Sequence, residues 1–247
     1  MKNRDLLGGI EITNNSAVSS LRKKAVIVGG LYIIGTVAGV LSVVLTGPLL
    51  KDPVDLIKIS ANANSIILGS LSVLAMGISL AMVPILMYPI LKKESETLAV
   101  GYLVFRGALE TFTYLTTVIS FLHLLTLSQA YAQAGATATL SYQAYGIVLA
   151  DTKMIGSITT IVFIIGALMF YSILYRSKLI PRWLSGWGLV STIPYIVSGM
   201  LVLFDIIGND SIIQTLLYLP LAIQEMVLGV WLIVKGFNSS IVSLKSK

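Results

Sequence analysis

Cysteine is absent from the chain, histidine occurs once, and charged residues make up only 11% of the 247 residues. Without cysteine the protein has no disulfide, thiolate zinc site, iron–sulfur cluster or cysteine nucleophile. A lone His123 excludes a histidine metal cluster. Soluble domains carry about 25% charged residues, so this composition excludes a soluble globular enzyme and a disordered chain. We therefore expect no cofactor, no metal and no catalytic residue.

Long apolar runs dominate what is present, with 56% hydrophobic residues and a mean hydropathy of +0.90. A bilayer core about 30 Å thick needs about 20 apolar residues in a helix that rises about 1.5 Å per residue. Six stretches meet this requirement, and they run from about Ala25 to Thr46, Ser65 to Leu91, Leu98 to Leu125, Thr152 to Tyr175, Leu184 to Phe204 and Ile213 to Val234. The sequence therefore predicts an all-α fold, a polytopic transmembrane helix bundle with six spanning helices.

Basic residues flank these runs mainly on one side of the predicted membrane. They are Lys2, Arg4, Arg22, Lys23 and Lys24 before the first run, Lys92 and Lys93 after the second, Arg176, Lys178 and Arg182 after the fourth, and Lys235, Lys245 and Lys247 after the sixth. Because loops rich in Lys and Arg stay in the cytoplasm, we expect both termini there. The formal net charge of +6 then indicates topology and contact with the lipid bilayer of the cell (plasma) membrane, and not nucleic-acid binding.

Three segments follow from this reading of the chain. We expect a cytoplasmic N-terminal segment at 1–24, interfacial or disordered, a six-helix transmembrane domain at 25–237, and a cytoplasmic tail at 238–247. The longest loop, Ser128 to Ala150, contains no Lys or Arg and is predicted on the outer side. Loops of this length without structure are uncommon, so we expect it to extend the third and fourth helices, with a lid as the alternative.

Three ionisable residues fall near the middle of the predicted membrane. At about 1.5 Å per residue, Arg106 and Glu110 lie roughly 12 and 18 Å from the inner edge of the third helix, and Glu225 lies roughly 14 Å from that of the sixth. An unpaired charge at this depth costs roughly 2.5–3.5 kcal/mol. Arg106 and Glu110 share a helix face, and a planar guanidinium can serve two carboxylates. We therefore predict that Arg106 bridges Glu110 and Glu225.

Polar residues continue the face of the third helix that carries Arg106. Tyr102, Arg106, Glu110, Thr113, Thr117 and Ser120 recur at steps of three or four residues, and Gln224 adjoins Glu225. Such a stripe indicates either hydrogen bonds between helices or a cavity that holds a ligand. In the second case the ligand-binding residues are Arg106, Glu110, Glu225, Gln224, Tyr102, Thr113 and Thr117.

Three motifs carry a resemblance to a known family. They are Leu103 to Glu110 (LVFRGALE), Ile180 to Gly188 (IPRWLSGWG), and Gln224-Glu225 followed by Gly229 to Phe237 (GVWLIVKGF). Together they resemble the bacterial and archaeal multi-pass membrane proteins called domain of unknown function 4386, from Ala25 to Phe237. The resemblance implies a six- or seven-helix plasma-membrane protein without an assigned activity. The matching motif positions are Arg106, Glu110, Pro181, Arg182, Trp183 and Glu225.

Two functions remain open at this level, with enzymatic activity a remote third. The first is a small-molecule or lipid binding or transport-type protein, in which the Arg–Glu–Glu cluster lines a polar pocket between the third and sixth helices. The second is a structural or accessory membrane protein, in which the cluster only fixes helix packing. Catalysis is the least favoured because no Ser–His pair can be placed together, and there is no Gly-rich phosphate-binding loop and no set of metal ligands. The oligomeric state and the ligand cannot be read from the sequence.

Overall fold

The computed structural model describes residues 2–51, 53–135, 140–209 and 211–238, with side chains from residue 19 onward. Every regular element in these ranges is a helix. Six helical stretches are long and apolar enough to cross a membrane, namely Ser19–Thr46, Ala63–Leu91, Glu96–Ala134, Leu140–Ser177, Arg182–Leu203 and Ile212–Val234. The all-α fold and the six spanning helices predicted from the sequence are thus confirmed, each within a few residues of its expected centre.

The chain order of the helices is simple. The elements are α1 (Lys2–Thr46), α2 (Leu56–Ala61), α3 (Ala63–Leu91), α4 (Glu96–Tyr102), the π-helical segment η1 (Leu103–Leu109), α5 (Glu110–Ala134), α6 (Leu140–Ala150), α7 (Lys153–Ser177), α8 (Arg182–Leu203) and α9 (Ile212–Val234). The third span is therefore composite, because α4, η1 and α5 follow one another without a break. Helix α1 already begins at Lys2, within the segment expected to be interfacial or disordered.

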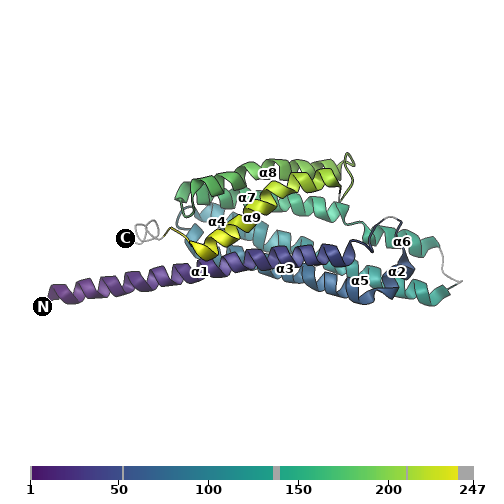
Figure 1. Cartoon of the computed structure of the whole chain (residues 1–247), viewed down its shortest axis with the longest axis horizontal. Coiled ribbons are helices and arrows are strands. Elements are labelled where there is room, and N and C mark those ends of the chain that lie inside the picture. The colour runs from purple at the N-terminus through teal and green to yellow at the C-terminus, as the bar shows by residue number, and fades with distance from the viewer. Residues whose placement is uncertain (1, 52, 136–139, 210, 239–247) are drawn as a thin grey trace.

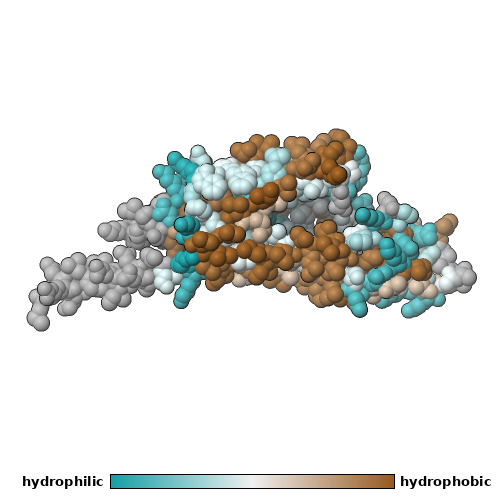
Figure 2. Space-filling view, viewed as in Figure 1, coloured by the Kyte–Doolittle hydropathy of each residue, from teal (hydrophilic) through white to brown (hydrophobic). Residues whose placement is uncertain are grey.

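The spans lie side by side as an elongated bundle (Figure 1). Helix α1 packs against α3 and α9, α7 packs against α8 and the third span, and α8 packs against α9. The start of α1 and the end of α9 lie at one end of the bundle, as an even number of spans requires. We call this the basic end, because Lys92 follows α3, Arg182 begins α8, Lys235 follows α9, and Arg22 contacts the last turn of α9 there. Figure 2 shows an apolar surface along the bundle with hydrophilic residues gathered near its two ends.

The long loop predicted at Ser128 to Ala150 is largely helical. Helix α5 continues to Ala134, and α6 returns over Leu140–Ala150. The rings of Tyr131 and Tyr142 pack at 5.9 Å between centroids, and the Ser120 hydroxyl donates to the carbonyl of Leu149 at 2.8 Å. The described part of the loop thus extends the spans, as predicted.

Helices α1 and α9 cross at a pair of glycines near the basic end. A Cβ atom on Gly29 would overlap the carbonyl oxygen of Gly229, so only hydrogen leaves room for this approach. Arg22 reinforces the crossing, because its guanidinium donates to the carbonyls of Leu232 at 2.9 Å and of Ile233 in the last turn of α9. These carbonyls have no partner inside the helix, and a cation suits a helix C-terminus.

Candidate functional site

The backbone around Arg106 departs from an α-helix. Arg106 lies in η1, and π-helical turns inside longer helices are frequent at functional sites. Gly166 of α7 allows this segment to come close, because a Cβ atom there would lie 3.2 Å from the Arg106 backbone nitrogen. Gly107 faces α3 in the same way, with Pro84 3.3 Å from an added Cβ atom. The site is therefore built where the third span packs tightly on two neighbours.

The Arg106 side chain joins the third span to α9. It is buried, and its Nη1 donates to both carboxylate oxygens of Glu110, at 2.7 and 2.9 Å. Its Nη2 donates to Oε1 of Glu225 at 3.2 Å. The predicted bridge between two carboxylates is thus confirmed. It neutralises charges that would be costly inside a membrane.

The two carboxylates are held very differently. Glu110 is 1% exposed, and its Oε1 also accepts a 2.5 Å hydrogen bond from the Tyr114 hydroxyl. The side chain of Glu225 is 18% exposed, and among the described residues it accepts a single hydrogen bond, from Arg106. Glu110 is therefore the fixed partner of Arg106, and Glu225 is the accessible end of the cluster.

Aromatic side chains enclose the three charged groups. The guanidinium of Arg106 lies 4.4 Å from the ring centroid of Phe163 of α7, which stabilises a cation through the face of the ring. Tyr102 stacks on Phe170 at 4.5 Å, and its buried hydroxyl lies beside Tyr32 without a partner in full hydrogen-bond geometry among the described residues. Burial among rings strengthens each electrostatic contact in the cluster.

Gln224, a predicted ligand contact, is engaged within the protein. It is fully buried; its Oε1 accepts from the Tyr171 hydroxyl at 2.5 Å, and its Nε2 donates to the Leu184 carbonyl at 3.0 Å. The side chain thus ties α9 to α7 and to the start of α8. A role as a ligand contact stays a prediction.

The threonines of the polar stripe also bond internally. The Thr113 hydroxyl donates to the Glu110 carbonyl at 2.7 Å, and the Thr117 hydroxyl donates to the Thr113 carbonyl at 3.1 Å. Both bonds are made within their own helix, which is how hydroxyls are commonly satisfied in apolar surroundings. We therefore centre the candidate site on Glu225, Arg106, Tyr102 and Tyr32, and the part expected of the two threonines remains untested.

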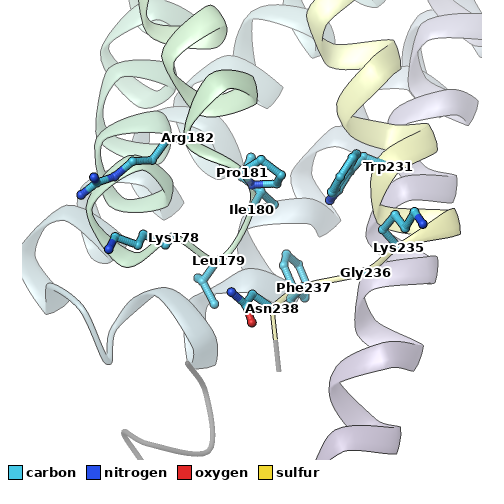
Figure 3. A pocket seen from close by; sticks show the side chains of 10 residues that line it. All are labelled: Lys178, Leu179, Ile180, Pro181, Arg182, Trp231, Lys235, Gly236, Phe237 and Asn238. Carbon is cyan, nitrogen blue, oxygen red and sulfur yellow. The ribbon is translucent and has the colours of Figure 1, made fainter. Parts of the chain in front are cut away.

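A separate pocket of ≈ 520 Å³ opens at the basic end (Figure 3). Ile180 and Pro181 of the α7–α8 connection face Trp231 of α9 and Phe237 across it. The charged end of Arg182 turns away from this space, onto the ring of Tyr175 at 5.3 Å. None of the three charged residues of the cluster lines this pocket. It is therefore distinct from the polar pocket expected between the third and sixth spans.

The described ranges show no evident metal-binding site. No group of three or more His, Asp or Glu side chains there is arranged to hold a metal ion. Arg106 also occupies the space between the two carboxylates, so one metal ion could not be shared by both of them. The arrangement suits the binding of one charged group at Glu225.

Sequence reasoning missed the partners that distinguish Glu110 from Glu225. Tyr114 follows Glu110 by one helical turn, a spacing at which side chains meet, so a search for such pairs would find it. Phe163 and Tyr32 carry no such signal, because an aromatic residue in an apolar run is most often packing. Their place beside the cluster follows only from the contacts between spans.

Comparison with known proteins identifies the family of the chain. No curated protein and no solved structure matches the chain. The family model described as Domain of unknown function (DUF4386) matches residues 27–236, which include the whole Arg106, Glu110 and Glu225 cluster. With six helices able to cross a membrane and a family model that covers most of its length, the chain belongs to the DUF4386 family.

Proposed function

We propose that this protein binds a small molecule or lipid within the membrane and belongs to the transport-type class, with Glu225 as the ligand-facing group. The supporting observation is the unequal anchoring of the two carboxylates. Glu110 is saturated by Arg106 and Tyr114, whereas Glu225 keeps one bond and 18% of its side-chain surface. A group placed only to hold helices together would gain by full burial and by filling its hydrogen-bonding capacity.

We also propose that the protein lies in the cell membrane with both termini in the cytoplasm. The basic end carries the Lys and Arg residues that the positive-inside rule keeps on the cytoplasmic side. Glu225 lies one helical turn outward from Gly229, where α1 and α9 cross. A ligand would then reach Glu225 from the outer half of the bilayer.

Labelling with a hydrophobic carbodiimide tests the accessibility of Glu225. Membranes that contain the protein are treated with the reagent, and the modified peptides are identified by mass spectrometry. We expect modification of Glu225 with little of Glu110, because only Glu225 presents surface. Replacing Glu225→Gln provides the matched control, since it removes the reactive group and keeps the side-chain shape. Equal modification of both glutamates, or of neither, would contradict the proposal.

The structural alternative has one observation in its favour, the Arg106 link between the third span and α9. If the cluster only fixes packing, a triple apolar variant (Arg106→Met, Glu110→Leu, Glu225→Leu) should fold as well as the parent, as buried ion clusters often tolerate. Under the binding proposal, that variant folds but loses every effect of ligands on the protein. Thermal unfolding in detergent, with and without candidate ligands, separates the two readings.

A further inference from the structure

The cluster at mid-membrane contains more acid than base. Arg106 contributes one positive charge, and Glu110 and Glu225 contribute two carboxylates. The other titratable groups near it in the described ranges are tyrosines of the third span and of the neighbouring helices, which are neutral when protonated: Tyr32, Tyr102, Tyr114, Tyr171 and Tyr195. With all three charged residues ionised, the cluster keeps one surplus negative charge, which is costly in a membrane.

The contacts place this surplus on Glu225. Both oxygens of Glu110 accept from Arg106 Nη1, and the Tyr114 hydroxyl adds a third bond. The single bond from Arg106 to Glu225 is longer, at 3.2 Å. The better neutralised carboxylate is therefore Glu110, and the remaining demand for positive charge is at Glu225.

Tyr102 contributes a buried aromatic ring beside the cluster. Its hydroxyl is buried beside Tyr32, without a partner in full hydrogen-bond geometry among the described residues. The ring is held by its stack on Phe170. Tyr32, from α1, adds another ring, and aromatic faces attract cations.

The surroundings of Glu225 indicate a ligand with an apolar body. Glu225 lies one helical turn outward of Gly229, where α1 and α9 are in contact at Gly29. Beyond this crossing the two helices diverge, and Figure 2 shows the surface hollowed between them. The side chains of α1 in this outer half are apolar and exposed, including Val37 and Val40. A solute that enters between two spans must first dissolve in the membrane.

We infer that Glu225 receives a single positive charge, carried by a lipophilic organic cation that enters between α1 and α9, or by a proton that takes its place. This inference rests on the proposed function and names the chemical class of its ligand. Both sources neutralise the same carboxylate, so they compete. Binding of the organic cation should weaken as the pH falls, because a protonated Glu225 no longer attracts it.

A pair of probes with the same shape and opposite charge tests the sign. Tetraphenylphosphonium and tetraphenylborate are each dialysed to equilibrium against the purified full chain in neutral detergent. We expect saturable binding of the phosphonium alone, weakened roughly tenfold or more by Glu225→Gln, as the loss of a charged contact implies. The variant Glu96→Gln, which removes an exposed carboxylate at the basic end, should bind as the parent does.

Infrared spectroscopy tests whether a proton, and not an organic cation, supplies the positive charge at Glu225. If neither probe binds, a carboxylic acid band that appears in the parent as the pH falls and is absent from Glu225→Gln identifies the proton as the source. Glu225-dependent binding of the borate, or the absence of both phosphonium binding and the acid band, overturns the inference.

Carbodiimide labelling keeps this inference separate from the proposed function. If Glu225 is labelled and the borate protects it, the site binds ligands and only the sign of charge is wrong. If Glu225 is not labelled at all, the proposed function itself fails. If Glu225→Gln does not fold, the parent protein is used instead. Tetraphenylphosphonium should then protect Glu225 from the carbodiimide, whereas tetraphenylborate should not, and protection by the borate alone overturns the inference.

Discussion

Among single residues, the three charged side chains of the cluster should contribute unequally to the stability of the fold. Arg106 donates to both acids, Glu110 accepts three hydrogen bonds in full burial, and Glu225 accepts one. Removing one partner from a buried ion pair costs about 3–5 kcal/mol, because the other charge is left uncompensated. Removing a charge that was already in surplus leaves a balanced pair. The same type of substitution should therefore have unequal effects at the two glutamates.

We predict that stability falls most for Arg106→Gln, less for Glu110→Gln and least for Glu225→Gln. Arg106→Gln leaves two buried carboxylates side by side and should cost about 3–5 kcal/mol. Glu225→Gln keeps the Arg106–Glu110 pair and should change stability by less than about 1 kcal/mol. Thermal unfolding in detergent measures the order, with Glu96→Gln as the exposed control. Equal losses at both glutamates would show that the surplus charge is shared and not local to Glu225.

The cost of charge in lipid made Arg106, Glu110 and Glu225 recognisable before any fold was known. Helical spacing alone placed Arg106 next to Glu110, and similar depth placed both level with Glu225. The partners Tyr114 and Phe163 could not be selected in this way. Aromatic residues of this kind occur in any apolar span, and their contact with the cluster depends on which helix lies opposite.

Among the helices, close contact between two elements depends on a few glycines, whereas other glycines of the same helices face open space. Gly29 faces the backbone of α9, whereas a Cβ atom on Gly30 would meet open space. On α7, Gly166 faces the backbone of Arg106, whereas Gly156 faces nothing within 4 Å. Each pair therefore contains a test position and its own control on the same helix.

We predict that Gly29→Ala disrupts the crossing of α1 and α9, whereas Gly30→Ala has little effect. The new methyl group would overlap the Gly229 carbonyl oxygen, which cannot move without shifting the helix. Overpacking of this kind costs about 1–3 kcal/mol. The melting temperatures of the two variants provide the comparison, and similar values would contradict the close approach of these helices.

Gly166→Ala should loosen the site through η1. Its Cβ atom would lie 3.2 Å from the Arg106 nitrogen, so α7 or η1 must move by a few tenths of an ångström. We expect a loss of about 1 kcal/mol and faster carbodiimide labelling of Glu225, with Gly156→Ala unchanged. A melting temperature and a labelling rate that both match those of Gly156→Ala would show that the Arg106 backbone does not depend on this contact.

For the molecule as a whole, the bundle has six described helices able to cross a membrane, and the first and the last of them, α1 and α9, begin and end at the basic end. The chain has no cysteine, so an introduced cysteine is the sole thiol and reports its own side of the membrane. Lys51 follows α1 and Lys93 follows α3, and both are exposed. Because these two spans are consecutive and cross the bundle in opposite directions, the two lysines lie at opposite ends of the bundle.

We predict that a membrane-impermeant maleimide labels Lys51→Cys in intact cells and labels Lys93→Cys only after the cells are permeabilised. The expectation follows from cytoplasmic retention of the basic end. The fraction of labelled protein is measured by a gel shift. Labelling of Lys93→Cys in intact cells would invert the proposed topology and place the accessible edge of Glu225 toward the cytoplasm.

The number of spans, their places in the chain and the three charges that must meet all follow from the order of the amino acids. These features depend on hydropathy, helix rise and the cost of an unpaired charge, which are local or one-dimensional quantities. Tertiary structure alone decided that Glu110 is saturated and Glu225 is open, that Gln224 is used internally, and that η1 is a π-helical segment. Those outcomes depend on which helices pack together and how closely. That in turn is set by side chains far apart in sequence, such as Gly29 with Gly229 and Gly166 with Arg106.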